Sequence, residues 1–232
     1  MELFNTLALC ATLLASPPVI DASNPVNKNQ CNEAYQEYKN LLKNIRVTPI
    51  ERQAIAMVAH AEAANQGDAG LAGVVYTILN RSMQGKFGEG IIGVINKPWQ
   101  FEPVQKAGGW ENLPNVTPEF SARIDTIINL ALDGYLPDLT HGSLFFQNPA
   151  IVSKRELAGE VSKGLTDFGG SVPVVTIRDH SWYSRFIPEH KEVHMPDITN
   201  EETGGDCLSL DIFARNQGAT SADIFNRSGQ DG

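Results

Sequence analysis

Residues 48–81 read TPIERQAIAMVAHAEAANQGDAGLAGVVYTILNR, and this stretch decides the fold. It opens with a capping box in which Thr48 stands at the N-cap, Pro49 at the first helical position and Glu51 three residues after the cap. The sequence therefore predicts a helix over residues 48–64.

One polar side chain lies on the apolar side of that helix. Ile55, Val58 and Ala59 recur at helical spacing and predict the face turned toward the core. Glu62 continues the same stripe, seven residues after Ile55. The pattern places a carboxyl group on the core-facing side, near the end of the helix.

A second helix follows over residues 68–83 and is the most hydrophobic element of the chain. We expect Asn65, Gln66 and Gly67 to end the first helix and Asp68 to cap the second. The second helix is predicted to end at Asn80–Arg81 and to pack against the first, with Glu62 on a cleft floor. Its apolar stripe comprises Leu71, Val74, Val75, Ile78 and Leu79.

The rest of the central region predicts a mixed fold. A short helix is expected over residues 91–95, and another begins at residue 117 and stops at Gly134. Residues 142–148 and 171–183 favour extended structure, with a loop containing at most one helical turn between them. We therefore predict an α+β class, a mostly helical domain with a small β element. The expected regions are an N-terminal segment at 1–23, a polar arm at 24–47, a main domain at 48–187 and a polar C-terminal tail at 188–232.

The N-terminal segment resembles a signal peptide. Leu3 to Ala15 is an apolar run of the length of a signal-peptide core, followed by small residues and prolines. Glu2 is atypical, because ordinary signals begin with positive charge. We expect export to the periplasm or cell wall, or release during phage lysis. An uncleaved anchor and a buried N-terminal helix remain as alternatives.

The three cysteines leave the disulfide pattern open. If Cys10 leaves with a signal peptide, Cys31 and Cys207 remain and can pair in an oxidising compartment. The alternative is two unpaired thiols. Neither has a second metal ligand at short spacing, so no structural zinc site is expected.

The negative net charge of the chain argues against nucleic acid as a partner. The formal net charge is −9, and non-specific nucleic-acid binding usually requires a basic surface. We expect no nucleic-acid partner, and the sequence predicts no obligate protein partner.

Glu62 is the leading catalytic candidate. Burial disfavours the ionised form of a carboxyl group and raises its pKa, which suits a general acid at neutral pH. Cleavage of a glycosidic bond needs such an acid, because the leaving oxygen is protonated as the bond breaks. Alone, a glutamate at a helix end is more often a solvated residue or a cap partner.

Several separated motifs, in order, resemble the SleB-type cell wall hydrolase family, which is named for spore-cortex-lytic enzymes. The resemblance rests on Glu62–Ala63, on Gly70, and on the apolar run GVVYTILNR at residues 73–81. It continues through Lys86–Phe87, Val94–Ile95, Gln100–Phe101, LFFQNP at residues 144–149 and IRDHSWY at residues 177–183. It covers about residues 50 to 185.

The resemblance implies a small lysozyme-like domain that acts on peptidoglycan. The bond implied is that between N-acetylmuramic acid and N-acetylglucosamine, and the family's catalytic glutamate falls on Glu62. The chain departs from the family pattern at Ala61, where glycine is common, and at Gln66, where a second glutamate is common. Because a partner carboxylate is missing there, we expect a lytic transglycosylase that forms 1,6-anhydro ends, with a muramidase as the alternative.

Five further residues are candidates for binding the glycan, and each has a structural alternative. Gln100 and Phe101 are expected in the groove, where Phe101 either stacks on a sugar or packs in the core. Asn148 and Tyr183 are expected to bind sugar hydroxyls or acyl groups, although Asn148 also suits a turn. His180 is expected to orient substrate or Glu62, or to be a structural histidine.

No cofactor or metal is expected from the motifs. His60–Ala61–Glu62 matches part of a zinc-deaminase pattern, but no cysteine lies between residues 31 and 207 to complete it. A non-catalytic glycan-binding module of the same fold remains the main alternative function. An amidase or peptidase is a weaker one, because it needs a metal site or a Cys–His pair.

Overall fold

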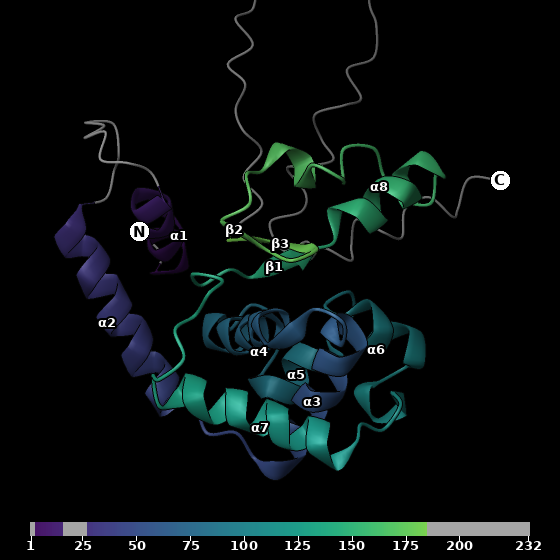
Figure 1. Ribbon diagram of the computed structural model, residues 1–232, viewed down its shortest axis with the longest axis horizontal. Helices are drawn as coiled ribbons and strands as arrows, with labels where there is room; N and C mark the ends of the chain where they lie inside the picture. The colour runs from purple at the N-terminus through teal and green to yellow at the C-terminus, as the bar shows by residue number, and fades with distance from the viewer. Residues whose placement is uncertain (1–2, 16–26, 185–232) are drawn as a thin grey trace, which may run out of the picture.

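The computed structural model describes residues 3–15 and 27–184, which form a helical body with a small sheet on one side (Figure 1). Within these residues the α-helices are α1 (Leu3–Ala15), α2 (Lys28–Asn44), α3 (Pro49–Ala63), α4 (Gly67–Gln84), α5 (Gly90–Asn96), α6 (Glu102–Ala107), α7 (Pro118–Leu132) and α8 (Pro149–Leu157). Two 3-10 helices are η1 (Trp110–Asn112) and η2 (Phe168–Gly170), and the strands are β1 (Phe145–Gln147), β2 (Val175–Ile177) and β3 (His180–Tyr183). The predicted α+β class is confirmed.

Helices α3 and α4 form the centre of the core, as predicted. The capping box of α3 is present, because the Thr48 side chain accepts the Glu51 amide and the Glu51 carboxylate accepts the Thr48 amide. In Figure 1, α4 lies between the sheet and the group formed by α3, α5 and α7. Because α4 is covered on both sides, nearly all of its residues from 70 to 81 are buried.

Both predicted ends of α4 are corrected. The N-cap is Gln66 rather than Asp68, and the Gln66 side chain makes no cap hydrogen bond. The helix does not close at Asn80–Arg81 but continues to Gln84, and Gly85 follows with φ 69°. Asn80 and Arg81 therefore stand inside the helix with buried side chains, and they are available to bond to neighbouring segments.

The sheet is antiparallel, with β3 between β1 and β2. The predicted extended segment 171–183 is a hairpin, in which Ile177 pairs with His180 across a two-residue turn. The sheet packs on α4 through Trp182, whose indole nitrogen donates to the Thr77 hydroxyl at 3.2 Å. Gly73 makes this approach possible, because a Cβ there would lie 2.5 Å from the Trp182 ring.

Two helices were not expected from the sequence. Helix α6 begins at Glu102, with Phe101 as its N-cap. Helix α8 occupies nine residues of the region predicted as a loop, and Asn148 caps it by accepting the amides of Ala150 and Ile151. Both helices are short, and a proline in the first turn starts each of them.

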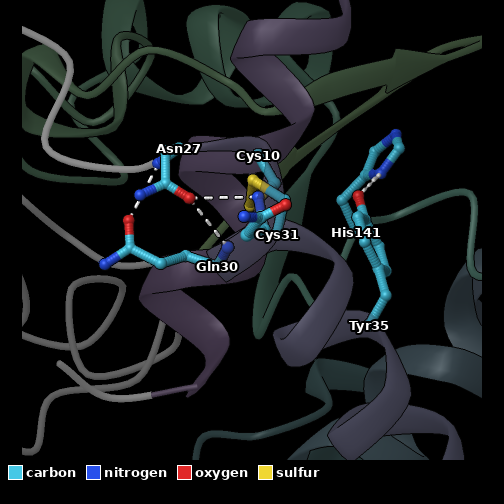
Figure 2. Close-up of a disulfide and its surroundings, with 7 residues drawn as sticks. Cys10, Asn27, Gln30, Cys31, Tyr35 and His141 are labelled. Atoms are coloured by element: carbon cyan, nitrogen blue, oxygen red, sulfur yellow. Dashed lines mark hydrogen bonds between the residues drawn. A yellow bond between two sulfur atoms is a disulfide. The ribbon is translucent and has the colours of Figure 1, made fainter.

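The N-terminal helices are joined by a disulfide that the sequence did not predict. Cys10 of α1 bonds to Cys31 of α2, so neither Cys31–Cys207 pairing nor a reduced Cys31 holds (Figure 2). Figure 2 also shows the capping box of α2, in which Asn27 accepts the amides of residues 29 and 30. Phe4 and Leu7 of α1 are buried in the main core.

Helix α1 thus matches the alternative of a buried N-terminal helix. The signal-peptide prediction itself remains a prediction. No helix among residues 3–15 and 27–184 is long and apolar enough to cross a membrane. The predicted C-terminal tail and Cys207 lie outside the described residues.

Candidate active site

Glu62 lies in the last turn of α3, close enough to Arg81 of α4 and Glu102 of α6 for their charges to act on its carboxyl group. Its side chain is partly buried, and no described residue forms a hydrogen bond with its carboxyl group. Burial raises the pKa of Glu62 to about 7, with a smaller increase from the negative charge of Glu102 and an opposing decrease from Arg81. A carboxyl group with this pKa carries its proton in a large fraction of molecules at neutral pH.

Arg81 is a fully buried cation beside Glu62. Its Nε donates to the carbonyl oxygen of Leu144 at 2.8 Å, and its Nη1 donates to the carbonyl oxygen of Gln100 at 3.2 Å. Its third nitrogen, Nη2, has no hydrogen-bond partner among the described residues. Burial lowers the pKa of Arg81 to about 9 and the charge of Glu62 opposes this, so the guanidinium stays protonated at neutral pH.

The guanidinium of Arg81 is enclosed by aromatic rings. It lies 4.9 Å from the ring centre of Phe101, 5.4 Å from that of Phe87 and 5.9 Å from that of Phe145. Such rings stabilise a cation that has been removed from water. Arg81 therefore connects the start of the sheet to the loop before α6, with its charge directed toward the Glu62 region.

Gln100 places an unpaired amide next to this cation. The residue is 3% exposed, and neither the oxygen nor the nitrogen of its side-chain amide has a partner among the described residues. Buried polar groups are normally hydrogen-bonded, and exceptions need an explanation such as a ligand or an ordered water. Gln100 is one of the predicted binding residues, and Arg81 links it to the region of Glu62.

Glu102 is a second carboxylate that the sequence analysis missed. Burial alone would raise its pKa, but hydrogen bonds from Lys106 and Arg155 and the charges of these residues hold the pKa of Glu102 below its ordinary value. The Lys106 ammonium lies 2.7 Å away, and the Arg155 guanidinium lies 3.1 Å away. The pKa values of these two carboxyl groups are thus shifted in opposite directions, which favours the neutral form of Glu62 and the charged form of Glu102.

Gln66, where the family pattern often has glutamate, has a clear structural role. It is buried, and its side-chain nitrogen donates to the Asp179 carboxylate at 3.0 Å. Its side-chain oxygen accepts the backbone amide of Asp179 at 3.2 Å. This pair of bonds joins the α3–α4 corner to the turn of the β2–β3 hairpin.

A groove of about 490 Å³ lies between that hairpin and the start of α8. Glu62 is not among its lining residues, although Gln66 binds Asp179 in its wall. The lining residues are Asn148, Pro149, Ala150, Ile151, Lys154, Thr176, Arg178, Asp179 and Ser181.

The remaining predicted binding residues are divided between the core and this groove. Phe101 is buried under Arg81, which favours the core alternative over a sugar-stacking role. Tyr183 is also buried, with its ring stacked on Phe168. Asn148 lines the groove while capping α8.

His180 is buried against the rings of Phe146 and Trp182, and its Nδ1 has no partner among the described residues. Burial lowers its pKa, with an opposing contribution from Asp179. Its neutral ring therefore suits a structural role or a hydrogen bond to substrate better than a permanent charge.

Within the described ranges, no group of three or more His, Cys, Asp or Glu side chains could hold a metal ion.

Comparison with known families adds an independent observation. Residues 65–172 match a family model described as Cell Wall Hydrolase. The match begins three residues after Glu62 and ends before the β2–β3 hairpin. No curated protein and no solved structure is significantly similar to the chain.

Proposed function

Because residues 65–172 match a family model described as Cell Wall Hydrolase, we propose that this chain acts on peptidoglycan and cleaves its glycan strand. The proposed bond joins N-acetylmuramic acid to N-acetylglucosamine, and Glu62 is the proposed acid catalyst. The preferred reaction is lytic transglycosylation.

One observation carries this proposal: Glu62 holds its proton near neutral pH beside a buried cation. Its pKa of about 7 follows first from burial. A general acid works best when its pKa lies near the working pH, since it must be protonated and still release the proton readily. Gln100 and Arg81 also carry buried polar groups that have no partner among the described residues, and we propose that substrate binding engages them.

In the first step, Glu62 donates its proton to the glycosidic oxygen. The bond between that oxygen and C1 of the muramic sugar breaks, and the N-acetylglucosamine side leaves with a 4-hydroxyl group. Positive charge develops at C1, and Glu62 becomes a carboxylate. The buried charge of Arg81 stabilises this carboxylate, because opposite charges interact strongly where water is excluded.

In the second step, the Glu62 carboxylate takes the proton from the 6-hydroxyl of the muramic sugar. The 6-oxygen bonds to C1 and closes a 1,6-anhydro ring, and Glu62 is again protonated. No water is consumed and no carboxylate nucleophile is needed. The position of Gln66 supports this route, because its amide is engaged by Asp179 and cannot serve as a base.

Hydrolysis by a muramidase is the second candidate, and Glu102 specifically favours it. This carboxylate is close enough to raise the pKa of Glu62, and it is held in the charged form. Paired acidic groups with separated pKa values are typical of glycosidases. Against this role, Lys106 and Arg155 already bind the Glu102 oxygens.

The two reactions are separated by digesting purified peptidoglycan and determining the product ends by mass spectrometry. Transglycosylation gives 1,6-anhydro-muramic ends, whereas hydrolysis gives reducing ends that are heavier by one water. Glu102→Gln is the matched variant, and we expect it to keep the anhydro product with altered rate. Exclusively reducing ends from the unchanged protein would reject transglycosylation, and their loss in Glu102→Gln would assign hydrolysis to Glu102.

We also propose that the protein acts outside the cytoplasm. The Cys10–Cys31 disulfide supports this, because such bonds persist in oxidising compartments. Cleavage after the apolar run would remove Cys10 and this bond, so export with α1 retained suits the structure better. Intact-mass measurement of the exported protein, with and without reductant, tests for both the N-terminal residue and the disulfide.

A further inference from the structure

The groove between α8 and the β2–β3 hairpin contains two cations that nothing in the proposed reaction uses. Lys154 comes from α8 and Arg178 from the hairpin turn, and both side chains are exposed. Neither forms an ion pair with a described residue. Among the described residues, the only carboxylate in the lining is that of Asp179, which accepts a hydrogen bond from Gln66. The groove therefore has an excess of positive charge.

Arg178 occupies a backbone conformation that favours glycine. It has φ 52° and is the first residue of the two-residue turn between Ile177 and His180. Left-handed backbone at such turns is normally supplied by glycine or asparagine, because a larger side chain is disfavoured there. The long cationic side chain is kept at an energetic cost, and such costs are typical of functional positions.

The fold holds this cation beside the corner that follows Glu62. Gly67 begins α4, and a Cβ there would lie 2.8 Å from the Arg178 guanidinium. The two hydrogen bonds between Gln66 and Asp179 hold the adjacent residue of the turn. Gln66 follows Glu62 by four residues, at the corner between α3 and α4, and its bonds to Asp179 connect this corner to the wall of the groove.

Peptidoglycan carries anionic groups close to the bond that we propose is cleaved. The muramic sugar at the scissile bond carries the stem peptide, whose residues have free carboxylates. Arginine and lysine bind carboxylates through charge-assisted hydrogen bonds. We propose that this groove is a subsite for a stem-peptide carboxylate, held by Arg178 and Lys154. This inference rests on the proposed function, since it assumes that peptidoglycan binds next to Glu62.

Binding to a catalytically inactive protein tests the subsite separately from the reaction. The Glu62→Gln protein is titrated calorimetrically with a disaccharide tetrapeptide and with the same disaccharide lacking its peptide. We expect the peptide to tighten binding by about tenfold, which corresponds to about 1.4 kcal/mol. The added variants are Arg178→Gly and Lys154→Ala, and Lys39→Gln on the outer face of α2 is the matched control.

The Arg178→Gly variant distinguishes a loss of binding from a loss of stability. Glycine adopts the observed φ more readily, so the thermal midpoint should not fall. The preference for the peptide should nevertheless disappear, and Lys154→Ala should reduce it. Lys39→Gln should leave it unchanged.

A peptide preference that survives in the Arg178→Gly, Lys154→Ala double variant would overturn the subsite, as would its absence from the parent protein. A glycerol-phosphate oligomer and a tetrapeptide with amidated carboxylates are the distinguishing ligands. If either of these ligands binds as tightly as the disaccharide tetrapeptide, and if that binding depends on Arg178, the assignment to a stem-peptide carboxylate is also overturned. If peptide-dependent binding is found but the unchanged protein cleaves no glycan, the proposed reaction fails and the subsite stands.

Discussion

Asn80 and Arg81 are neighbours on α4, both fully buried, yet they belong to two different kinds of polar region. Asn80 lies in a structural network with Tyr38, Asp138 and the carbonyl of Ser143. Its side-chain nitrogen lies 3.2 Å from both the Asp138 carboxylate and the Ser143 carbonyl, and its oxygen lies 2.7 Å from the Tyr38 hydroxyl. Every polar atom of the Asn80 side chain has a partner.

Arg81 lies in what we call the Glu62 cluster, formed by Glu62, Arg81 and Gln100. Here one guanidinium nitrogen and both amide atoms of Gln100 have no partner among the described residues. A satisfied network stabilises one fold, whereas buried groups left without partners cost stability. We propose that the first region serves the fold and that the second binds a ligand.

The largest expected effect is that of Glu62→Gln on cleavage. This change keeps the size of the side chain but removes the transferable proton. General acid catalysis contributes on the order of a hundredfold to ten-thousandfold, so we expect cleavage of purified peptidoglycan to fall by about a thousandfold. The measurement is the rate of release of soluble fragments.

Binding of the same variant to insoluble sacculi is the control, and it should remain nearly intact. Undiminished cleavage by Glu62→Gln would remove Glu62 from catalysis. If neither protein cleaves but both bind, the chain would instead be a glycan-binding module.

The second effect is a dependence of stability on pH that originates in the Glu62 cluster. The pKa of Glu62 is about 7 in the folded protein and about 4.5 when unfolded. Because the folded state holds the proton more tightly, this contribution to the free energy of unfolding is complete below about pH 4.5. It is lost as the pH rises to about 7. The loss is at most about 3 kcal/mol, since part of the side chain reaches solvent.

Denaturant unfolding at a series of pH values measures this loss. Glu62→Gln is the matched comparison, because a glutamine does not titrate and its curve should be flatter over the same range. Parallel curves for the two proteins would show that Glu62 is not the group responsible.

The contrast between Asn80 and Arg81 also shows which features of the site could be predicted from the sequence. Glu62 and the two central helices follow from local patterns, namely a capping box and an apolar stripe at helical spacing. The role of Arg81 does not, because its partners Leu144 and Gln100 are brought to it only by tertiary packing. The Asn–Arg pair was interpreted as a helix end, although two buried polar residues in an apolar helix can also indicate a tertiary network.

Glu102 and the disulfide were missed for related reasons. Helix α6 is only six residues long, which is too short for a periodic signal, so Glu102 was not placed on an element. The cysteines were paired on the assumption that Cys10 is removed, whereas α1 packs on the core and brings Cys10 to Cys31. Both errors concern contacts that a linear pattern does not encode.

A smaller effect is expected from Gln100→Leu, which tests the meaning of the unpaired amide. Leucine fills similar space without a buried polar group, so the free energy of unfolding should stay the same or rise. Cleavage should nevertheless slow by about tenfold, the effect of losing about 1.4 kcal/mol of transition-state binding. The Arg81 bond to residue 100 uses the backbone carbonyl and is retained.

Thermal unfolding and initial cleavage rates, measured on one preparation, give both quantities. A loss of stability together with unchanged cleavage would place Gln100 in the structural network and erase the contrast between the two regions. Gln100→Glu is a useful companion, because a second carboxyl group near Glu62 should raise the pKa of Glu62 further and extend activity to higher pH.

The smallest effect is expected from Tyr38→Phe. In contrast to Gln100→Leu, this change should lower stability and leave cleavage unchanged. The change removes one hydroxyl from between Asn80 and Asp138 and leaves the ring packed against Phe4. Losing one hydrogen bond in a buried network costs about 1 kcal/mol, so the thermal midpoint should fall while the cleavage rate at a temperature well below it stays the same. Urea unfolding and the fragment-release assay measure the two quantities. If Tyr38→Phe slowed cleavage as much as Gln100→Leu, the two regions would be coupled through α4, and satisfied hydrogen bonding would no longer distinguish fold from site in this protein.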